Sequence, residues 1–180
     1  LFCLNSALVS RVRRLISAIL LSCAGCSAAI GDEPRTIVLL PFELIDSTAE
    51  LIPFPEKEIQ LLSVTNLLRK KFVEEQLYTV LSSPQIDAEI ARQQARYDLA
   101  DCNGCEQDIA RLAGADRVLI AWVQRATALI LNVNIEIRDV STSNIILRKS
   151  SEIRGNTDAN WRRAVRHIVR SMVERGQANR

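Results

Sequence analysis

The chain has little of several residue types on which common enzyme classes depend. It contains one histidine, five prolines and six glycines among 180 residues. A serine or cysteine nucleophile ordinarily needs a histidine base, and His167, which lies among arginines, is favoured as a solvated surface residue. No glycine-rich phosphate loop, no HExxH pattern and no dinucleotide-binding fingerprint occurs, which removes the commonest nucleotide-binding and metalloprotease classes. The sequence therefore implies no enzyme, no metal site and no cofactor.

Length and composition predict a single folded domain. Apolar residues make up 48% of the chain and charged residues 24%, which excludes a disordered or low-complexity protein. A domain of about 150 residues buries roughly two thirds of its unfolded surface, so that it folds without a structural metal. No apolar run is long enough for a stable membrane span.

The first 29 residues resemble a secretory leader. They hold three arginines and no acidic residue, followed by an apolar run from Leu15 to Leu21 and by small residues from Ser27 to Ala29. The segment Leu20–Cys23 is also similar to a lipobox, which makes Cys23 the lipidation candidate. We therefore expect a signal peptide or lipoprotein leader over residues 1–29 and one domain over residues 30–180. The protein is then periplasmic, with a lipid anchor, plain cleavage near Ala29 and an uncleaved leader as open alternatives.

Without the leader, the charges are nearly balanced, with 20 basic and 21 acidic side chains. This balance and the export signal argue against binding to nucleic acid. Residues 30–116 hold 8 basic and 16 acidic groups, whereas residues 117–180 hold 12 and 5. We expect the two parts to attract each other.

Cys102 and Cys105 are the two cysteines that belong to the expected domain. In an oxidising compartment this pair predicts a local disulfide, with Gly104 supplying the turn. A redox-active dithiol has the same spacing, but it normally follows a strand at the start of a helix, whereas this pair lies between two helical segments. A zinc site would need two further ligands that the chain does not offer nearby.

Apolar patterning predicts an α/β (α+β) domain with a mixed five-stranded sheet. Residues 36–42 and 118–123 are continuous apolar runs of the kind found in central strands, and residues 78–81 form a short strand parallel to the first. Residues 129–138 alternate between apolar and polar, so that one face meets solvent, and residues 145–154 return as an antiparallel partner. The sheet thus has a βαβ start and a C-terminal antiparallel meander.

Helical spacing predicts four helices around this sheet. The first begins near Pro55 and continues to Phe72, and two shorter ones cover residues 87–100 and 106–113, with Gly114 as a stop. The last is amphipathic and is capped by Thr157 or Asp158. Its apolar positions are Trp161, Val165, Ile168 and Met172.

Charged residues supply the remaining candidates for a site. The last helix carries four partner-binding candidates: Arg162, Arg163, Arg166 and Arg170. The alternative is that these arginines form a solvated face whose charge is balanced by the acidic first half of the chain. Glu43 and Asp46 follow the first strand, where open α/β sheets place ligands. A small-ligand carrier using Asp46 and Ser82 is therefore a third possibility.

Several short segments carry a family resemblance. They are Cys105-Glu106, Asp108-Ile109-Ala110-Arg111, the run from Gly114 to Ile120, the run from Ile137 to Val140, the run from Ile153 to Asp158, and Trp161-Arg162. In these segments the chain resembles an uncharacterised family of small exported proteobacterial proteins. In layout it resembles the amino-terminal domain of TolB, although no β-propeller follows.

The resemblance implies a non-catalytic accessory or interaction module of the cell envelope, with an envelope protein as its partner. Contact with a membrane would then occur only through the leader or a lipid anchor. Two alternatives remain open, an accessory protein of a periplasmic quinoprotein alcohol dehydrogenase system and a thiol-disulfide enzyme that uses Cys102 and Cys105.

Overall fold

The structure is a computed structural model that describes residues 35–46, 56–127 and 129–176. Its elements follow in the order β1 (Thr36–Asp46), α2 (Lys57–Glu74), β2 (Thr79–Val80), α3 (Pro84–Gln94), α4 (Cys105–Leu112), β3 (Arg117–Arg125), β4 (Ile130–Asp139), β5 (Ile145–Arg154) and α5 (Asp158–Glu174). The expected order of strands and helices is therefore found. The predicted leader over residues 1–29, its Cys23 and the helix start at Pro55 lie outside the described residues.

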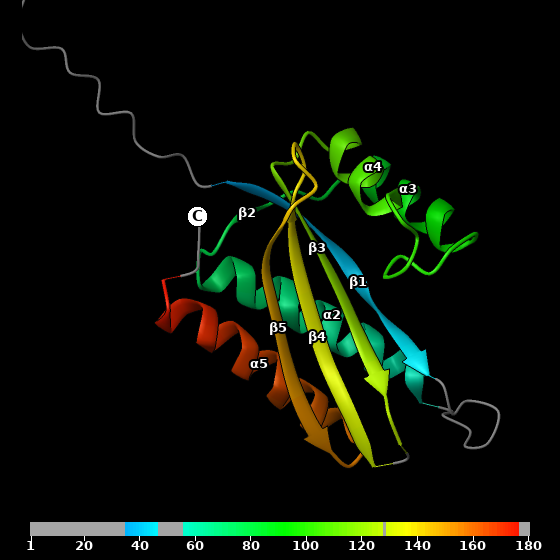
Figure 1. The fold of residues 1–180 in the computed structure, drawn as a ribbon, viewed down its shortest axis with the longest axis vertical. Helices are drawn as coiled ribbons and strands as arrows, with labels where there is room; N and C mark the ends of the chain where they lie inside the picture. Colours follow the sequence, from blue (N-terminus) through cyan, green and yellow to red (C-terminus); the bar gives the residue numbers. More distant parts are fainter. Residues whose placement is uncertain (1–34, 47–55, 128, 177–180) are drawn as a thin grey trace, which may run out of the picture. The chain divides into compact units, whose positions relative to one another are not determined.

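The five strands form one mixed sheet in the order β2-β1-β3-β4-β5 (Figure 1). Strand β1 is parallel to β2 and β3, whereas β3, β4 and β5 form an antiparallel meander. The two continuous apolar runs lie in the adjacent strands β1 and β3, where both faces of the sheet are covered. The predicted fold class and topology are confirmed.

Helices lie on both faces of the sheet, but they do not cover them equally (Figure 1). On one face, α2 and α5 bury a large core whose fully buried members include Phe72, Leu119, Leu131 and Trp161. On the other face, α3 and α4 pack on β1 and β3 around a smaller core that contains Val38, Ile90, Ile109 and Ile120. On this second face the helices pack mainly on β1 and β3, and α4 contacts β4 through the ion pair of Glu106 with Arg138.

Strand β1 continues further than the sequence predicts. The expected strand ends at Phe42 because of Pro41, but β1 extends to Asp46. The register with β3 shifts between Leu39 and Phe42, so that the proline lies at an irregularity of the ladder, where its missing N–H is tolerated. The hydroxyl of Thr65 in α2 then accepts the backbone N–H of Phe42 at 2.9 Å.

The predicted helix over residues 87–100 is displaced along the chain. Helix α3 begins at Pro84, because the hydroxyl of Ser83 caps it by accepting a backbone N–H of the first turn at 3.3 Å. It ends at Gln94, and the segment that follows turns back so that Leu99 is buried. The other short helix, α4, begins one residue before its predicted start.

Strand β4 follows the predicted alternation with one exception. Its inward side chains Leu131, Val133, Ile135 and Ile137 are fully buried. The expectation that the opposite face meets solvent is wrong at Glu136, whose exposure is only 2%. This carboxylate is buried because arginines of β4 and β5 cover it.

The acidic first part and the basic second part of the chain attract each other as expected. Asp46 of β1 pairs with Arg125 of β3 at 3.0 Å, and both side chains are more than nine-tenths buried. Glu106 of α4 pairs with Arg138 of β4 at 2.6 Å. Both ion pairs join a residue before position 117 to a residue after it.

Candidate functional site

Helix α5 is fixed at its start and along its apolar face. Thr157 is its N-cap, since the hydroxyl accepts the backbone N–H of Asn160 at 3.3 Å. The indole N–H of Trp161 donates to the side-chain oxygen of Asn156 at 3.0 Å, and the ring is fully buried. This anchoring leaves the opposite face of the helix directed away from the core.

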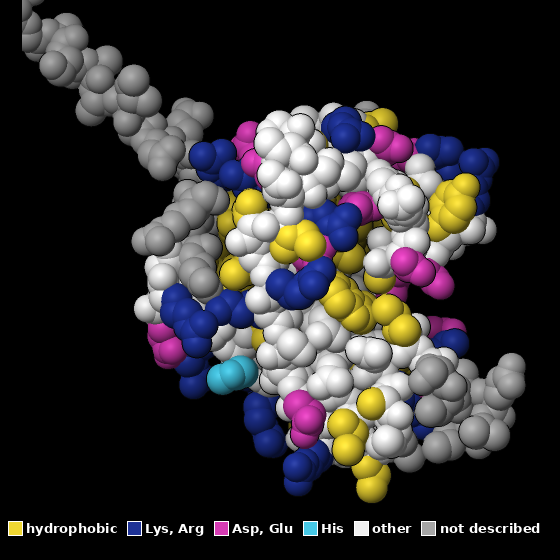
Figure 2. Space-filling view, viewed as in Figure 1, with side chains coloured by type: hydrophobic (Ala, Val, Ile, Leu, Met, Phe, Trp, Pro, Cys, Tyr) yellow, Lys and Arg dark blue, Asp and Glu magenta, His cyan; other side chains and the backbone are white. Residues whose placement is uncertain are grey.

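Three arginines lie along that opposite face. Their spacing of three and four residues places them in one row, which we call the arginine stripe: Arg163, Arg166 and Arg170. The stripe borders a groove of about 550 Å³ between α5 and β5, called here the α5–β5 groove, whose other lining residues are Ser151, Glu152, Ile153, Arg154, Asn160, Ala164 and His167. Figure 1 shows α5 alongside the outer edge of β5, and Figure 2 shows Lys and Arg side chains gathered at this margin.

The α5–β5 groove carries an excess of positive charge. All three side chains of the arginine stripe are exposed, and none of them forms an ion pair with a residue that the structure describes. The one acidic residue in its lining, Glu152, lies 3.6 Å from Arg154. Farther along β5, burial and the positive charge of Arg175 lower the pKa of Lys149. The groove is therefore suited to a negatively charged ligand.

Arg162, the fourth partner-binding candidate, has a different environment. Its guanidinium donates to the Ser63 hydroxyl of α2 at 3.0 Å and lies 3.9 Å from Asp158. It joins the two helices and is not among the residues that line the groove. The structure thus brings three of the four candidates together, and their role in binding stays a prediction.

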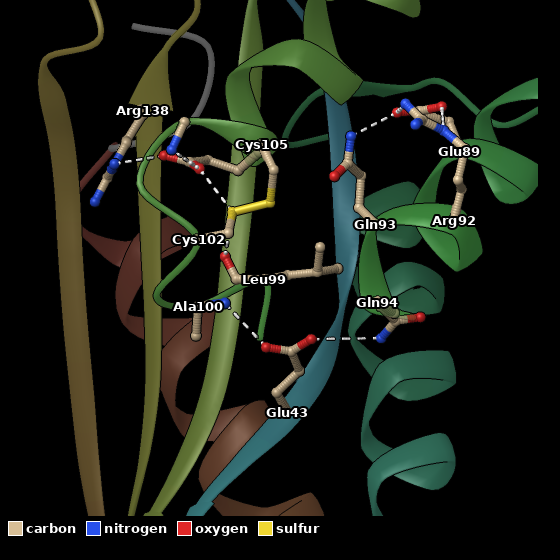
Figure 3. Close-up of a disulfide and its surroundings, with 12 residues drawn as sticks. Glu43, Glu89, Arg92, Gln93, Gln94, Leu99, Ala100, Cys102, Cys105 and Arg138 are labelled. Carbon is tan, nitrogen blue, oxygen red and sulfur yellow. Dashed lines mark hydrogen bonds and ion pairs between the residues drawn. A yellow bond between two sulfur atoms is a disulfide. The ribbon is translucent and has the colours of Figure 1, made fainter. Parts of the chain in front are cut away.

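Cys102 lies in the connection between α3 and α4, but Cys105 is the first residue of α4, so the expectation that the whole pair lies between two helices is wrong (Figure 3). The structure joins Cys102 and Cys105 in a disulfide with Cα atoms 5.7 Å apart. Gly104 between them has a φ of 127°, a conformation that favours glycine, and it is the N-cap of α4. Glu106 accepts the backbone N–H of Gly104 at 2.9 Å, so a buried carboxylate holds the loop.

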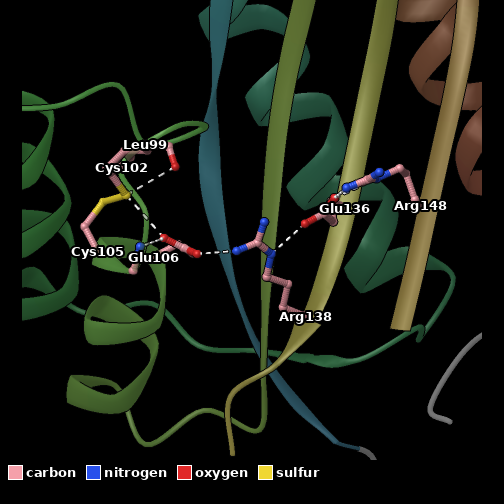
Figure 4. Close-up of polar contacts among 8 residues, drawn as sticks. Leu99, Cys102, Cys105, Glu106, Glu136, Arg138 and Arg148 are labelled. Carbon is pink, nitrogen blue, oxygen red and sulfur yellow. Dashed lines mark hydrogen bonds and ion pairs between the residues drawn. A yellow bond between two sulfur atoms is a disulfide. The ribbon is translucent and has the colours of Figure 1, made fainter. Parts of the chain in front are cut away.

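A chain of charged side chains connects this loop to the sheet (Figure 4). Arg138 donates to Glu106 at 2.6 Å and to Glu136 at 2.5 Å, and Arg148 of β5 donates to Glu136 at 2.7 Å. The two carboxylate side chains are 3% and 2% exposed. Because each buried carboxylate has a cation beside it, the network ties α4 to β4 and β4 to β5.

The same loop contains the one group of three potential metal ligands in the described part of the chain. It consists of Cys102, Cys105 and Glu106, whose ligand atoms lie within 4.8 Å of one another. Two sulfurs joined in a disulfide are not thiolates, and the carboxylate already pairs with Arg138. The arrangement therefore favours a structural crosslink over a metal centre.

Glu43 and Asp46, which the sequence places after the first strand, lie within β1 and have structural partners. Glu43 accepts the backbone N–H of Ala100 at 2.9 Å (Figure 3), which ties the loop before the cysteines to β1. Asp46 is held by Arg125 in the buried ion pair described above. Asp46 also borders a hollow of about 630 Å³ beside Trp122, but Ser82 is not part of that lining. The structure does not bring together the pair expected for a ligand carrier.

Sequence reasoning missed the network of Glu106, Glu136, Arg138 and Arg148. A signal for part of it was available, since Glu136 and Arg138 share one face of an alternating strand. The partner Arg148 could not be found in this way, because Arg148 lies opposite Glu136 only after a register shift between Ile137 and Arg138. The contribution of Glu106 depends on the packing of α4 and had no signal in the sequence.

Within the described residues, no helix is both long enough and apolar enough to cross a membrane.

Comparison with known proteins identifies a family. Residues 35–173 match the family model described as "Protein of unknown function (DUF2380)". The match covers well over half of the chain and nearly all of the described residues, so the expectation of an uncharacterised family is confirmed. The comparison with curated proteins gives no match.

Several solved structures are similar to the chain. The LpoB C-terminal domain from Salmonella enterica is 17% identical, with a TM-score of 0.49, over 79% of this chain and 94% of that one. Lipoprotein GNA1162 from Neisseria meningitidis is 18% identical, with a TM-score of 0.48, over 80% and 97%. TolB from Acinetobacter baumannii is 14% identical, with a TM-score of 0.46, over 80% and 29%. TolB, whose layout the sequence predicts, is thus among the similar structures.

Proposed function

Since the chain belongs to this family of unknown function, we propose from its own structure that it is a non-catalytic interaction module of the cell envelope. The observation that carries the proposal is the arginine stripe beside the α5–β5 groove. Three exposed arginines without an ion pair among the described residues form a surface on which an oppositely charged partner gains electrostatic complementarity. Such a surface supports binding and requires no chemistry of its own.

We further propose that the module works in the periplasm, as a single domain over residues 30–180. The leader-like sequence over residues 1–29 and the Cys102–Cys105 disulfide both support an oxidising compartment. Lipidation at Cys23 would anchor the domain to a membrane. Fractionation of cells fed labelled palmitate tests this placement, with Cys23→Ala as the comparison. Recovery of the chain in the cytosol with its leader intact would contradict the periplasmic location.

Site-specific photo-crosslinking in cells tests the interaction itself. A photoreactive residue at position 167, inside the groove, should yield a discrete adduct with an envelope protein. The same residue at position 111, exposed on α4, is the matched control and should not. Replacing the arginine stripe with glutamates should abolish the adduct. Equal crosslinking from both positions, or none from position 167, would refute the proposed function.

The accessory role in a quinoprotein alcohol dehydrogenase system is a narrower form of this proposal. It predicts that the adduct from position 167 contains a component of that system, which mass spectrometry of the adduct would identify. An unrelated envelope protein in the adduct would remove this form and leave the general proposal in place.

A thiol-disulfide enzyme remains the second candidate, because the cysteine pair is present and Cys105 begins a helix. A carboxylate oxygen of Glu106 lies 3.2 Å from the sulfur of Cys102, where its negative charge disfavours a thiolate. Insulin reduction by the chain and by its Cys105→Ser variant separates the two candidates. Activity that the substitution abolishes would favour the enzyme.

A further inference from the structure

We propose that the α5–β5 groove binds an acidic, extended segment of a partner protein, which adds to the sheet as a strand beside β5. The inference rests on the proposed function, because it specifies the partner's chemistry at the same surface. Strand β5 has ten residues and is the last strand in the sheet order. Among the described residues, no strand pairs with its outer edge, and the Asn160 side chain donates to one carbonyl of this edge, that of Arg154 at 2.9 Å. The outward backbone groups before Arg154 can therefore pair with an incoming chain.

The neighbouring helix supplies charges at a spacing that suits such a chain. Successive members of the arginine stripe are three and four residues apart, which is a rise of about 4.5 and about 6 Å along α5. Side chains on one face of an extended chain repeat every ~6.6 Å. Acidic residues at alternate positions of an added strand would therefore lie near successive arginines. The recognised pattern is an acidic residue at every second position.

The shape of the surface favours a peptide over a membrane. The arginine stripe borders a hollow of about 550 Å³. Residues of the edge strand β5, among them Ser151 and Ile153, form part of its lining. An extended chain can enter this groove and reach both the strand edge and the guanidinium groups. A flat lipid surface would meet the rim of the groove and would leave the strand edge unpaired. The unpaired edge and the positive charge thus point to the same kind of ligand.

Fluorescence anisotropy with a labelled peptide of alternating Glu and Val, about eight residues long, tests the inference on the full chain. We expect the peptide to bind, and replacement of the arginine stripe with alanines to weaken binding at least about tenfold. The matched control replaces three exposed arginines of α3, α4 and the turn between them, Arg92, Arg96 and Arg111, and should leave binding unchanged. Equal weakening in both variants would overturn the inference, as would binding that the stripe does not affect.

Two further arms separate strand addition from simple charge attraction and from lipid binding. A peptide with N-methyl groups at alternate backbone positions keeps its charge but loses strand pairing, so it should bind about tenfold more weakly. Equal affinity of the methylated peptide would overturn strand addition. Vesicles containing phosphatidylglycerol should bind the chain no differently after replacement of the stripe, and stripe-dependent sedimentation without peptide binding would also overturn the inference. If crosslinking from position 167 persists while the peptide fails, only this inference fails and the proposed function stands.

Discussion

Replacing Arg138 with alanine should cost far more stability than replacing an exposed arginine of the same sheet. Arg138 donates to Glu106 and Glu136, whose side chains are 3% and 2% exposed. Removing one partner of a buried ion pair costs about 3–5 kcal/mol, because the remaining charge is left uncompensated. Glu136 keeps Arg148 as a partner, so the loss falls mainly on Glu106. We therefore expect the free energy of unfolding to fall by about 3 kcal/mol.

Urea unfolding at neutral pH, followed by tryptophan fluorescence, measures this loss. The matched control is Arg154→Ala on β5, because that side chain is 86% exposed and its partner Glu152 is 56% exposed. An exposed pair of this kind contributes less than about 1 kcal/mol. The reasoning would be refuted if Arg138→Ala lost no more than this, or if the two variants lost equal amounts.

A second substitution tests whether the buried charge of Glu106 is the cause of the loss. Adding Glu106→Gln to Arg138→Ala removes the uncompensated charge, so the double variant should be more stable than Arg138→Ala alone. A double variant less stable than the single one would show that the loss comes from lost packing.

Three further outcomes follow from the described contacts. The pKa of Asp139 is lowered, chiefly by the hydrogen bond from Ser141, so its contribution to stability is present above the unfolded pKa of about 3.9 and is lost as pH falls through the folded value. Urea midpoints of Asp139→Asn and the unchanged protein should therefore draw progressively closer as the pH falls below about 5. Reducing the Cys102–Cys105 disulfide should cost about 2 kcal/mol in urea unfolding, and the double Ser variant should not respond to reductant. Thr65→Val leaves a buried backbone N–H of β1 unsatisfied and should cost about 1–3 kcal/mol, measured in the same way.

The sequence predicts the sheet well because apolar periodicity is a local property. The continuous runs in β1 and β3 and the alternation in β4 follow from which faces are covered, and the observed order places them accordingly. The helix caps at Thr157 and Ser83 are local too, although only the first was recognised. Pro41 misled the prediction, since its missing N–H is tolerated at a bulge and the Thr65 hydroxyl of α2 accepts the N–H of the following residue, Phe42.

The candidate site was predictable only in part. The spacing of the arginine stripe is visible in the sequence, because residues three and four apart share a helix face. That Arg162 turns toward Ser63 depends on where α2 lies, and no local pattern carries this information. The groove likewise exists only because the final helix packs beside the last strand of the sheet. Side-chain roles that depend on packing between distant elements could not be read from the chain.

The two sets of arginines in the second half of the chain differ in one physical respect. Arg125 and Arg138 pair with carboxylates of the acidic first half, in positions that are largely buried. A solvated face balanced by that acidic half was the alternative interpretation of the arginine stripe. Those carboxylates, Asp46 and Glu106, are already engaged with other arginines, and the stripe forms no ion pair with any described residue. Glu75, which borders a hollow together with Arg166 and Arg170, lies 3.8 Å from Lys71. These three carboxylates each have another cation as their partner, which favours an external source of negative charge for the stripe.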